Sequence, residues 1–243
     1  MKDNFSSQSN LYAKYRPTYP NELYNFILAN CSNFNSAWDC GTGNGQVAGV
    51  LAEYFQEVKA TDISEQQLKN AIAKQNILYS RQAAEKTNFK NDSFDLITVA
   101  QAIHWFNFEE FYKEVERCLK PEGIFAVIGY ELFSSNEETN RVIDELYRDL
   151  LGPYWDKERY LLEEGYKTIP FPFKEIETPK ISLDLNWSFD DLIGYLKTWS
   201  AVKHYENDKG VNPVDILSKE LRQAYGERGV IHYPILFRLG KLS

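Results

Sequence analysis

The chain has 243 residues, of which 43% are hydrophobic and 15% aromatic, a length and composition that suit one large α/β domain with a sizeable core. We therefore expect residues 1–243 to form a single domain. The formal net charge of −8, with no long run of Lys or Arg, argues against nucleic acid or an anionic membrane surface as the main partner.

The cysteine pattern argues against a disulfide-stapled secreted protein. The three Cys, at positions 31, 40 and 118, are odd in number and lack paired spacing, which is typical of a reducing compartment. No Cys/His cluster has zinc-ligand spacing, so no metal is expected. Residues 1–10 are too polar for a signal peptide, and no apolar run reaches membrane-spanning length. We expect a cytoplasmic monomer or homodimer without a membrane-embedded part.

Strand and helix patterns alternate through the first half of the chain. Residues 12–20 are rich in Tyr, and Pro20 then opens a helix with apolar positions along one side. Strands are expected at residues 36–39, 58–61, 77–83, 94–100 and 124–130. Helices are expected between them, most clearly at residues 47–55, 64–72 and 108–119. Five strands alternating with helices predict a parallel sheet with right-handed crossovers.

The second half of the chain has a different character. Residues 137–151 have the pattern of one helix, whereas residues 152–179 are rich in aromatic side chains and Pro and have poor periodicity. A strand is expected at residues 181–187, followed by a helix that starts with the capping-box pair Ser188 and Asp191. A further helix begins at Pro213, and residues 231–239 form the last expected strand.

The turn after the first expected strand carries the strongest functional signal. Gly41, Gly43 and Gly45 stand at alternate positions, where glycine lets the backbone approach a ligand and the helix start points N–H groups at it. Asp62 follows about 20 residues later, where a carboxylate can bind a ribose hydroxyl pair. Asp62 could also begin the next helix, and the two roles are compatible. Gln46 replaces the small residue of a dinucleotide fingerprint, which favours a nucleoside with a small charged tail.

An ordered set of motifs now allows a family resemblance to be stated. Residues 39–45, Asp-Cys-Gly-Thr-Gly-Asn-Gly, resemble the first motif of class I S-adenosylmethionine (SAM) dependent methyltransferases. Further matching pieces are Thr61-Asp62-Ile63-Ser64, Ala84-Glu85, Ser93-Phe94-Asp95-Leu96-Ile97 and Leu119-Lys120-Pro121-Glu122-Gly123. Residues 15–20 and 101–106 resemble the small-molecule branch that includes trans-aconitate methyltransferase-like proteins. The resemblance covers residues 10 to 130 well and the remainder weakly.

The resemblance implies a fold and a cofactor. The fold is a Rossmann-like three-layer α/β sandwich with a mostly parallel seven-stranded sheet, an antiparallel last strand, and a helical and aromatic cap. We expect residues 1–30 to form an N-terminal cap segment and residues 152–180 a cap or lid. The implied cofactor is SAM, with S-adenosylhomocysteine as the product.

Ligands of such sheets lie beyond the carboxyl ends of the strands, which identifies candidate cofactor contacts. We assign this role to Asp39, Gly41, Gly43, Gly45, Asp62, Ile63, Ala84, Glu85, Ala100, Gln101, Tyr12 and Arg16. The resemblance puts the adenine edge at Ala84 and Glu85, although Glu85 could equally be a solvated acid. Arg16 could pair with a carboxylate, or it could only frame the first helix.

The acceptor pocket is expected beside the end of the fourth strand. We expect residues 12–19, with Tyr15 and Tyr19, on one side, His104 and Trp105 at the floor, and part of residues 152–173 above. His104 is the catalytic candidate, either as a general base or as a hydrogen-bond partner of an anionic acceptor. The alternative is a structural His bonded to nearby backbone.

Three functions stay open on the sequence alone. The first is methyl transfer from SAM to a small-molecule acceptor, with a carboxylate as one candidate. The second is a SAM-binding protein with a regulatory or interaction role and no transfer activity. The third is an NAD-dependent oxidoreductase, against which Gln46 counts.

Overall fold

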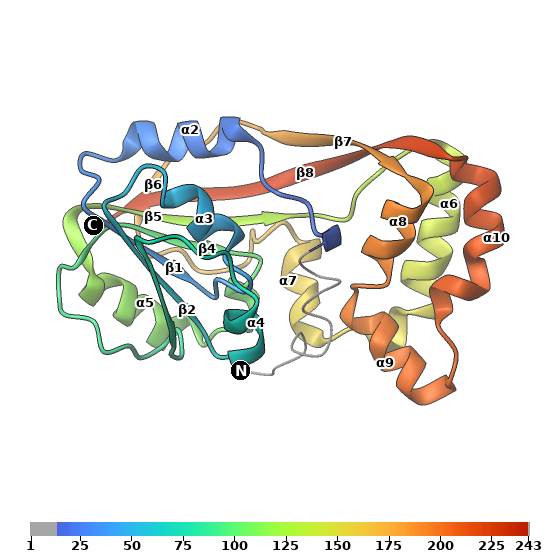
Figure 1. Cartoon of the computed structure of the whole chain (residues 1–243), viewed down its shortest axis with the longest axis horizontal. Helices are drawn as coiled ribbons and strands as arrows, with labels where there is room; N and C mark the ends of the chain where they lie inside the picture. The colour runs from blue at the N-terminus through green and yellow to red at the C-terminus, as the bar shows by residue number, and fades with distance from the viewer. Residues whose placement is uncertain (1–13, 243) are drawn as a thin grey trace.

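The computed structural model describes residues 14–242, and its centre is an eight-stranded sheet (Figure 1). The strand order is β3-β2-β1-β4-β5-β8-β6, with β7 paired to β8 outside this path. The strands span Ser36–Cys40 (β1), Glu57–Asp62 (β2), Ile77–Arg81 (β3), Phe94–Ala100 (β4), Leu119–Tyr130 (β5), Lys174–Ile176 (β6), Ser182–Ser188 (β7) and Arg228–Lys241 (β8).

The first five strands run parallel, and β8 runs antiparallel to its three neighbours β5, β6 and β7. A parallel strand that is covered on both faces reads as a near-continuous buried run. In β4 every residue except Ala100 is buried. The expected mostly parallel, Rossmann-like sheet with an antiparallel last strand is therefore confirmed.

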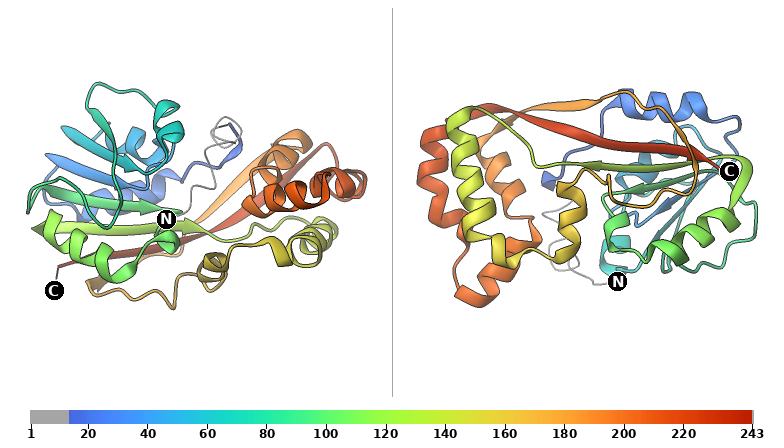
Figure 2. Two further views of the ribbon diagram at one scale, coloured as in Figure 1. Left: turned by 90° about the horizontal axis from the view of Figure 1, so that it is seen from below. Right: turned by 180° about the vertical axis from the view of Figure 1, so that it is seen from behind.

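Some of the helices cover the two faces of the parallel strands, and the others lie beyond them (Figures 1 and 2). The helices span Asn21–Asn30 (α2), Gln46–Leu51 (α3), Glu65–Lys69 (α4), Phe108–Cys118 (α5), Glu137–Asp144 (α6), Tyr160–Glu163 (α7), Phe189–Leu196 (α8), Ser200–Lys209 (α9) and Pro213–Tyr225 (α10). Successive residues of a strand point to opposite faces. Ala37 accordingly packs in one core with Ile27 of α2, and Trp38 packs in a second core with Phe111 of α5.

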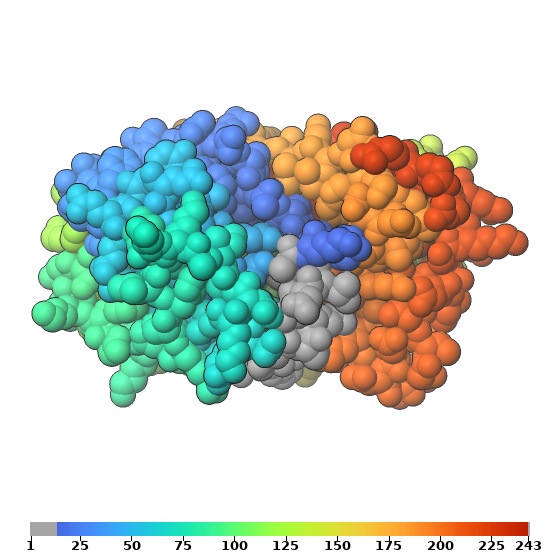
Figure 3. Space-filling view, in the orientation of Figure 1, coloured from blue at the N-terminus to red at the C-terminus, as the bar shows by residue number. Residues whose placement is uncertain are grey.

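Beyond the parallel strands, α6, α8, α9 and α10 form a group that we call the helical lobe (Figures 1 and 2). β7 and β8 extend into this lobe and join it to the sheet. Figure 3 shows the start of the described chain, in dark blue, where the sheet and the helical lobe meet. There Arg16 Nη2 donates a hydrogen bond to the carbonyl oxygen of Thr198, at 3.3 Å. No helix within residues 14–242 is long and apolar enough to cross a bilayer.

The structure differs from the sequence expectations mainly in the second half of the chain. β6 is an eighth strand inside residues 152–180, and its three residues are too few to show a period. The single helix expected at residues 137–151 is α6 followed by a π-helical turn, Glu145–Leu150. α9 was not expected, because only Ala201 and Val202 of its ten residues are buried.

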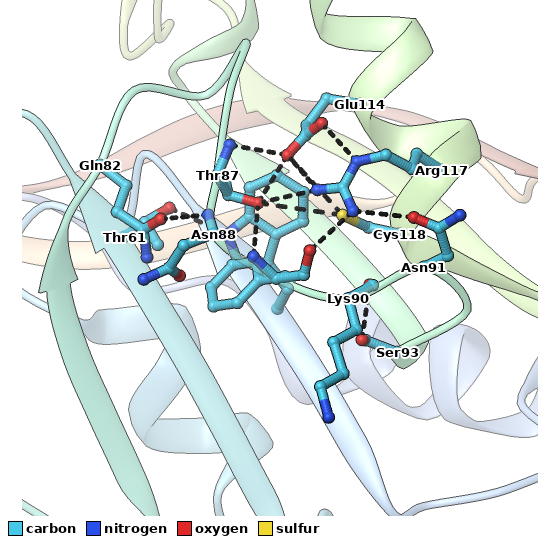
Figure 4. A network of polar contacts seen from close by, with 12 residues as sticks. Thr61, Gln82, Thr87, Asn88, Lys90, Asn91, Ser93, Glu114, Arg117 and Cys118 are labelled. Carbon is cyan, nitrogen blue, oxygen red and sulfur yellow. Dashed lines mark hydrogen bonds and ion pairs between the residues drawn. The ribbon is translucent and has the colours of Figure 1, made fainter.

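An ion pair between the buried Glu114 and the partly exposed Arg117 fixes the loop between β3 and β4 against α5 (Figure 4). Glu114 is 7% exposed, and its carboxylate accepts hydrogen bonds from the Thr87 N–H and hydroxyl, at 2.7 and 2.6 Å. Arg117 donates to the same carboxylate through Nε at 2.9 Å and Nη2 at 2.7 Å. Arg117 Nη1 also donates to the Phe89 carbonyl oxygen at 2.6 Å. These contacts hold the loop that carries Ala84 and Glu85.

Arg117→Ala should lower the free energy of unfolding by about 2–4 kcal/mol, because Glu114 would stay buried without its cation. The matched control is Arg148→Ala, since the Arg148–Asp144 pair is exposed, at 68% and 55%, and such pairs contribute little. Urea denaturation followed by circular dichroism measures both variants. Equal, small losses in the two variants would contradict the role given to the Glu114–Arg117 pair.

Candidate functional site

The glycine turn between β1 and α3 has the backbone that only glycine adopts readily. Gly41, Gly43 and Gly45 have φ angles of +67°, +55° and +80°. A Cβ atom on Gly45 would lie 2.2 Å from the Tyr79 hydroxyl, and one on Gly41 would lie 2.7 Å from Cβ of Ala102. Nothing lies within 4 Å of a Cβ placed on Gly43. Packing therefore closes the positions of Gly41 and Gly45, whereas Gly43 faces open space.

Asp39 fixes the glycine turn through hydrogen bonds. Its side chain is 1% exposed and accepts hydrogen bonds from the Thr42 hydroxyl (2.5 Å), the Thr98 hydroxyl (2.8 Å) and the Ala48 N–H (3.1 Å). Burial raises the pKa of Asp39 to about 6, against the opposing effect of these bonds. One carboxylate thus ties the glycine turn to α3 and to β4.

Asp62, at the end of β2, is hydrogen-bonded to the same turn. Its Oδ2 accepts the Gly43 N–H at 2.9 Å, and its Oδ1 accepts the Ser64 N–H at 2.8 Å. Ser64 in turn caps α4 by accepting the Gln67 N–H. Asp62 therefore contributes to the start of α4, as one of its two expected roles requires. A carboxylate offers about four acceptor positions, so bonds to two N–H groups are compatible with a ribose role, which stays a prediction.

A cavity of about 450 Å³, its open mouth included, lies against the glycine turn. Seven of the predicted site residues line it: Arg16, Tyr19, Asp39, Gly41, Gly43, Ala100 and Gln101. Arg16 Nη1 donates to the Tyr130 hydroxyl at 2.9 Å, and Gln101 Nε2 donates to the Tyr130 carbonyl oxygen at 3.0 Å. The sequence thus identified the glycine turn, the end of β4 and the segment before α2 as neighbours in space.

A second cavity, of about 440 Å³ with its mouth included, adjoins the first, because Arg16 and Gln101 line both. Its other lining residues come from the segment after β4, from residues 155–162 and from the turn between α8 and α9. They are His104, Trp105, Trp155, Asp156, Arg159, Leu162, Trp199 and Ser200. Two of the four predicted acceptor residues, His104 and Trp105, are among them.

His104 is a buried, neutral member of this second cavity. It is 6% exposed, and its Nδ1 lies 3.0 Å from the hydroxyl of Tyr166. Burial, together with the positive charge of Arg159, lowers the pKa of His104 to about 3. Within residues 14–242 its recorded hydrogen bond is to a side chain and not to backbone. The imidazole is therefore a weak base and, at neutral pH, a group with one N–H donor.

Two donors in this cavity were not predicted as individual residues, although Arg159 lies in the segment 152–173 that was expected to wall the acceptor pocket. Arg159 donates through Nε to the Tyr147 hydroxyl at 3.0 Å and lies 4.7 Å from the ring centroid of Trp155. Within the described part of the chain no carboxylate pairs with the Arg159 guanidinium. Trp199 is 1% exposed, and its Nε1–H has no partner among residues 14–242. No local pattern marks either residue as a donor to a ligand.

The remaining predicted residues lie elsewhere. Tyr19 lines the first cavity and not the second, and the ring of Tyr15 packs on Gly194 of α8. Ala84 is 3% exposed, Glu85 accepts the Asn107 N–H at 3.1 Å, and the Ile63 carbonyl oxygen accepts from Arg81 at 3.0 Å. Gly45 packs on Tyr79, away from the cavity lining. Tyr12 lies outside the described residues.

Comparison with known proteins identifies the family. The methyltransferase domain family matches residues 38–127. A Dictyostelium discoideum protein assigned as a methyltransferase is 34% identical, over 98% of this chain and 95% of its own length. A Saccharomyces cerevisiae protein assigned as a SAM-dependent methyltransferase is 25% identical, over 92% of this chain and 89% of its own. A solved structure from Anaeromyxobacter dehalogenans, described as a type II methyltransferase, has a TM-score of 0.85 and 36% identity, over 93% of this chain and 98% of that chain.

These matches decide against the NAD-dependent oxidoreductase and make SAM the cofactor. The narrower resemblance to trans-aconitate methyltransferase-like proteins stays a prediction. The chain belongs to the class I SAM-dependent methyltransferases.

Proposed function

We propose that this methyltransferase transfers the methyl group of SAM to a carboxylate of a small molecule held in the second cavity. The observation that carries the proposal is the Arg159 guanidinium, which lacks a carboxylate partner within the described residues and lines the second cavity, which shares Arg16 and Gln101 with the first. Arg159 is partly buried, and an anionic ligand in the second cavity would accept a charged hydrogen bond from it.

The residues of the first cavity fit SAM. The open space at Gly43 accepts a ligand against the backbone, and the start of α3 beside it favours the carboxylate end of an amino acid. Asp62 is not in the lining of this cavity, but its carboxylate accepts the N–H of Gly43, which is, and it would also accept the ribose hydroxyls. Ala100 and Gln101 would line the passage toward the acceptor, because Gln101 belongs to both cavities.

The second cavity offers donors and rings to an acceptor. Arg159 would pair with the carboxylate, and the neutral imidazole of His104 would donate one hydrogen bond to it. The Nε1–H of Trp199 is a third donor. Trp105 and Trp155 supply flat apolar walls for the rest of the molecule. Arg16 lies at the boundary with the cofactor cavity and adds positive charge there.

Methyl transfer to a carboxylate requires mainly that the protein position the two reactants. SAM, when bound, supplies a methyl group that its positive sulfur already makes electrophilic. A carboxylate is ionised at neutral pH and needs no base, which suits a His104 that is a weak base. The task of the residues is to hold one carboxylate oxygen and leave the other in line with the methyl group in a water-poor site.

The proposal is tested first at Arg159. Arg159→Met keeps a long stem against Trp155 but removes the cation, and should lower kcat/KM for carboxylic acids about 10–100-fold, as for a lost charged hydrogen bond of about 1.5–3 kcal/mol. Release of S-adenosylhomocysteine, measured with a panel of small carboxylic acids, gives the rates. Arg148→Met is the matched control, because Arg148 pairs with Asp144 outside the second cavity. A panel in which no carboxylic acid is methylated would favour a SAM-binding protein without transfer.

Asp62→Ala should weaken binding of S-adenosylhomocysteine by about 100-fold or more, because two charge-assisted bonds to ribose, at about 1.5–3 kcal/mol each, would be lost. Titration calorimetry measures the dissociation constant, and a thermal melt checks that the variant is folded. Glu65→Ala, at the exposed start of α4, serves as the control. An unchanged dissociation constant in Asp62→Ala would reject the ribose role.

The burial of neutral His104 makes stability depend on pH in a definite direction. Its pKa is about 3 in the folded chain and about 6.5 when unfolded. Between pH 6.5 and pH 3 the unfolded chain therefore carries a proton on His104 and the folded chain does not. In this range the free energy of unfolding falls by about 1.4 kcal/mol for each unit by which the pH is lowered. Between pH 7.5 and 5.0 the wild type should lose about 2 kcal/mol more than His104→Gln in urea denaturation. Equal losses would show that His104 titrates normally.

A further inference from the structure

We infer that Tyr166 is a positioning residue that holds His104 in the tautomer with its proton on Nε2, so that an N–H donor faces the second cavity. The use of that donor by a carboxylate rests on the proposed function, but the tautomer itself does not. No motif of the sequence indicates this pair, since the two residues are 62 positions apart.

The two side chains meet in a buried setting. Tyr166 is 1% exposed and His104 is 6% exposed. The Tyr166 hydroxyl lies 3.0 Å from Nδ1 of His104, and the ring centroids are 6.0 Å apart at an interplanar angle of 29°. His104 lines the second cavity, whereas Tyr166 stands behind it and is not in the lining. The hydroxyl therefore contacts the side of the imidazole that faces away from the acceptor.

The backbone places Tyr166 there at a cost. Its φ angle is +58°, a left-handed conformation that is unfavourable for a bulky residue and persists only where the surroundings impose it. The Tyr166 N–H donates to the Leu161 carbonyl oxygen at 2.9 Å, and Arg238 Nη1 donates to the Ile169 carbonyl oxygen at 2.8 Å. The ring packs on Gly129 of β5, where a Cβ atom would lie 2.9 Å from it. The segment that follows α7 is thus held in place by these contacts of Tyr166 and Ile169.

The chemistry of the pair selects one tautomer. A phenol hydroxyl is a good donor and a modest acceptor, whereas the bare nitrogen of a neutral imidazole is a good acceptor. The favoured bond therefore runs from the Tyr166 hydroxyl to Nδ1, which leaves the imidazole proton on Nε2. Within the described residues Nε2 has no recorded partner. An Nε2–H beside Arg159 would give an anionic acceptor two donors, whereas an Nε2 lone pair would repel it.

The experiment reads the tautomer directly by NMR. The chain has three histidines, so ¹⁵N-labelled histidine gives few signals, and His104→Gln assigns those of His104. In the folded full-length protein without ligand, we expect a lone-pair-type shift for Nδ1 and a protonated-type shift for Nε2. Tyr166→Phe keeps the ring and removes the hydroxyl, and its Nδ1 and Nε2 shifts should move toward each other as the tautomers mix.

The control is Tyr112→Phe, which removes a largely buried hydroxyl that donates to the Pro170 carbonyl oxygen and not to His104. It should leave the His104 signals unchanged. A protonated Nδ1 in the wild type, or an unchanged tautomer in Tyr166→Phe, would overturn the inference. The wild-type spectrum decides the first point even if Tyr166→Phe does not fold.

An activity arm separates this inference from the proposed function. With a carboxylic acid found by the panel, Tyr166→Phe should lower kcat about 10-fold, and the His104→Gln/Tyr166→Phe double variant should be no slower than His104→Gln alone. Fully additive losses would contradict a role that acts through His104. If the NMR result holds and no carboxylic acid is methylated, the proposed function fails while the tautomer assignment stands.

Discussion

The structure depends on one buried carboxylate. Asp39 accepts hydrogen bonds from the glycine turn, from the start of α3 and from Thr98 of β4. Burying an ionised carboxylate is unfavourable, which is why burial raises its pKa to about 6. The cost is offset by the hydrogen bonds from these three donors. Because those donors come from three different elements, the turn is fixed relative to the sheet before any ligand arrives.

The second constraint is the junction of the sheet with the helical lobe. β7 and β8 extend from the sheet into the lobe (Figure 1), and the turn between α8 and α9 lines the second cavity together with residues that follow β4. Arg16 bridges the junction through the Tyr130 hydroxyl and the Thr198 carbonyl oxygen. The two cavities share Arg16 and Gln101 as a result. The site is therefore made where sheet and lobe meet, and movement of either would change both cavities.

Local signals predicted most of the sheet and the cofactor side of the site. The apolar run of β4 and the alternate glycines after β1 are properties of short stretches, and the structure has them where the pattern indicated. Arg159, Trp199 and Tyr166 were not predicted, because their positions follow from long-range packing. The His104–Tyr166 contact joins residues 62 positions apart, and a residue with positive φ such as Tyr166 follows no propensity rule. β6 was not predicted because a strand of three residues is too short to show a periodic pattern.

The central claim is that the methyl group goes to a carboxylate oxygen, and the product bond tests it most directly. Esters of methanol are cleaved by mild base, whereas methyl groups on nitrogen, carbon or ether oxygen are not. The protein is incubated with SAM labelled in its methyl group and a metabolite extract, and the labelled small-molecule products are then treated with base. The account predicts that labelled methanol is released from them. Labelled products that withstand base, or no labelled product at all, would contradict it.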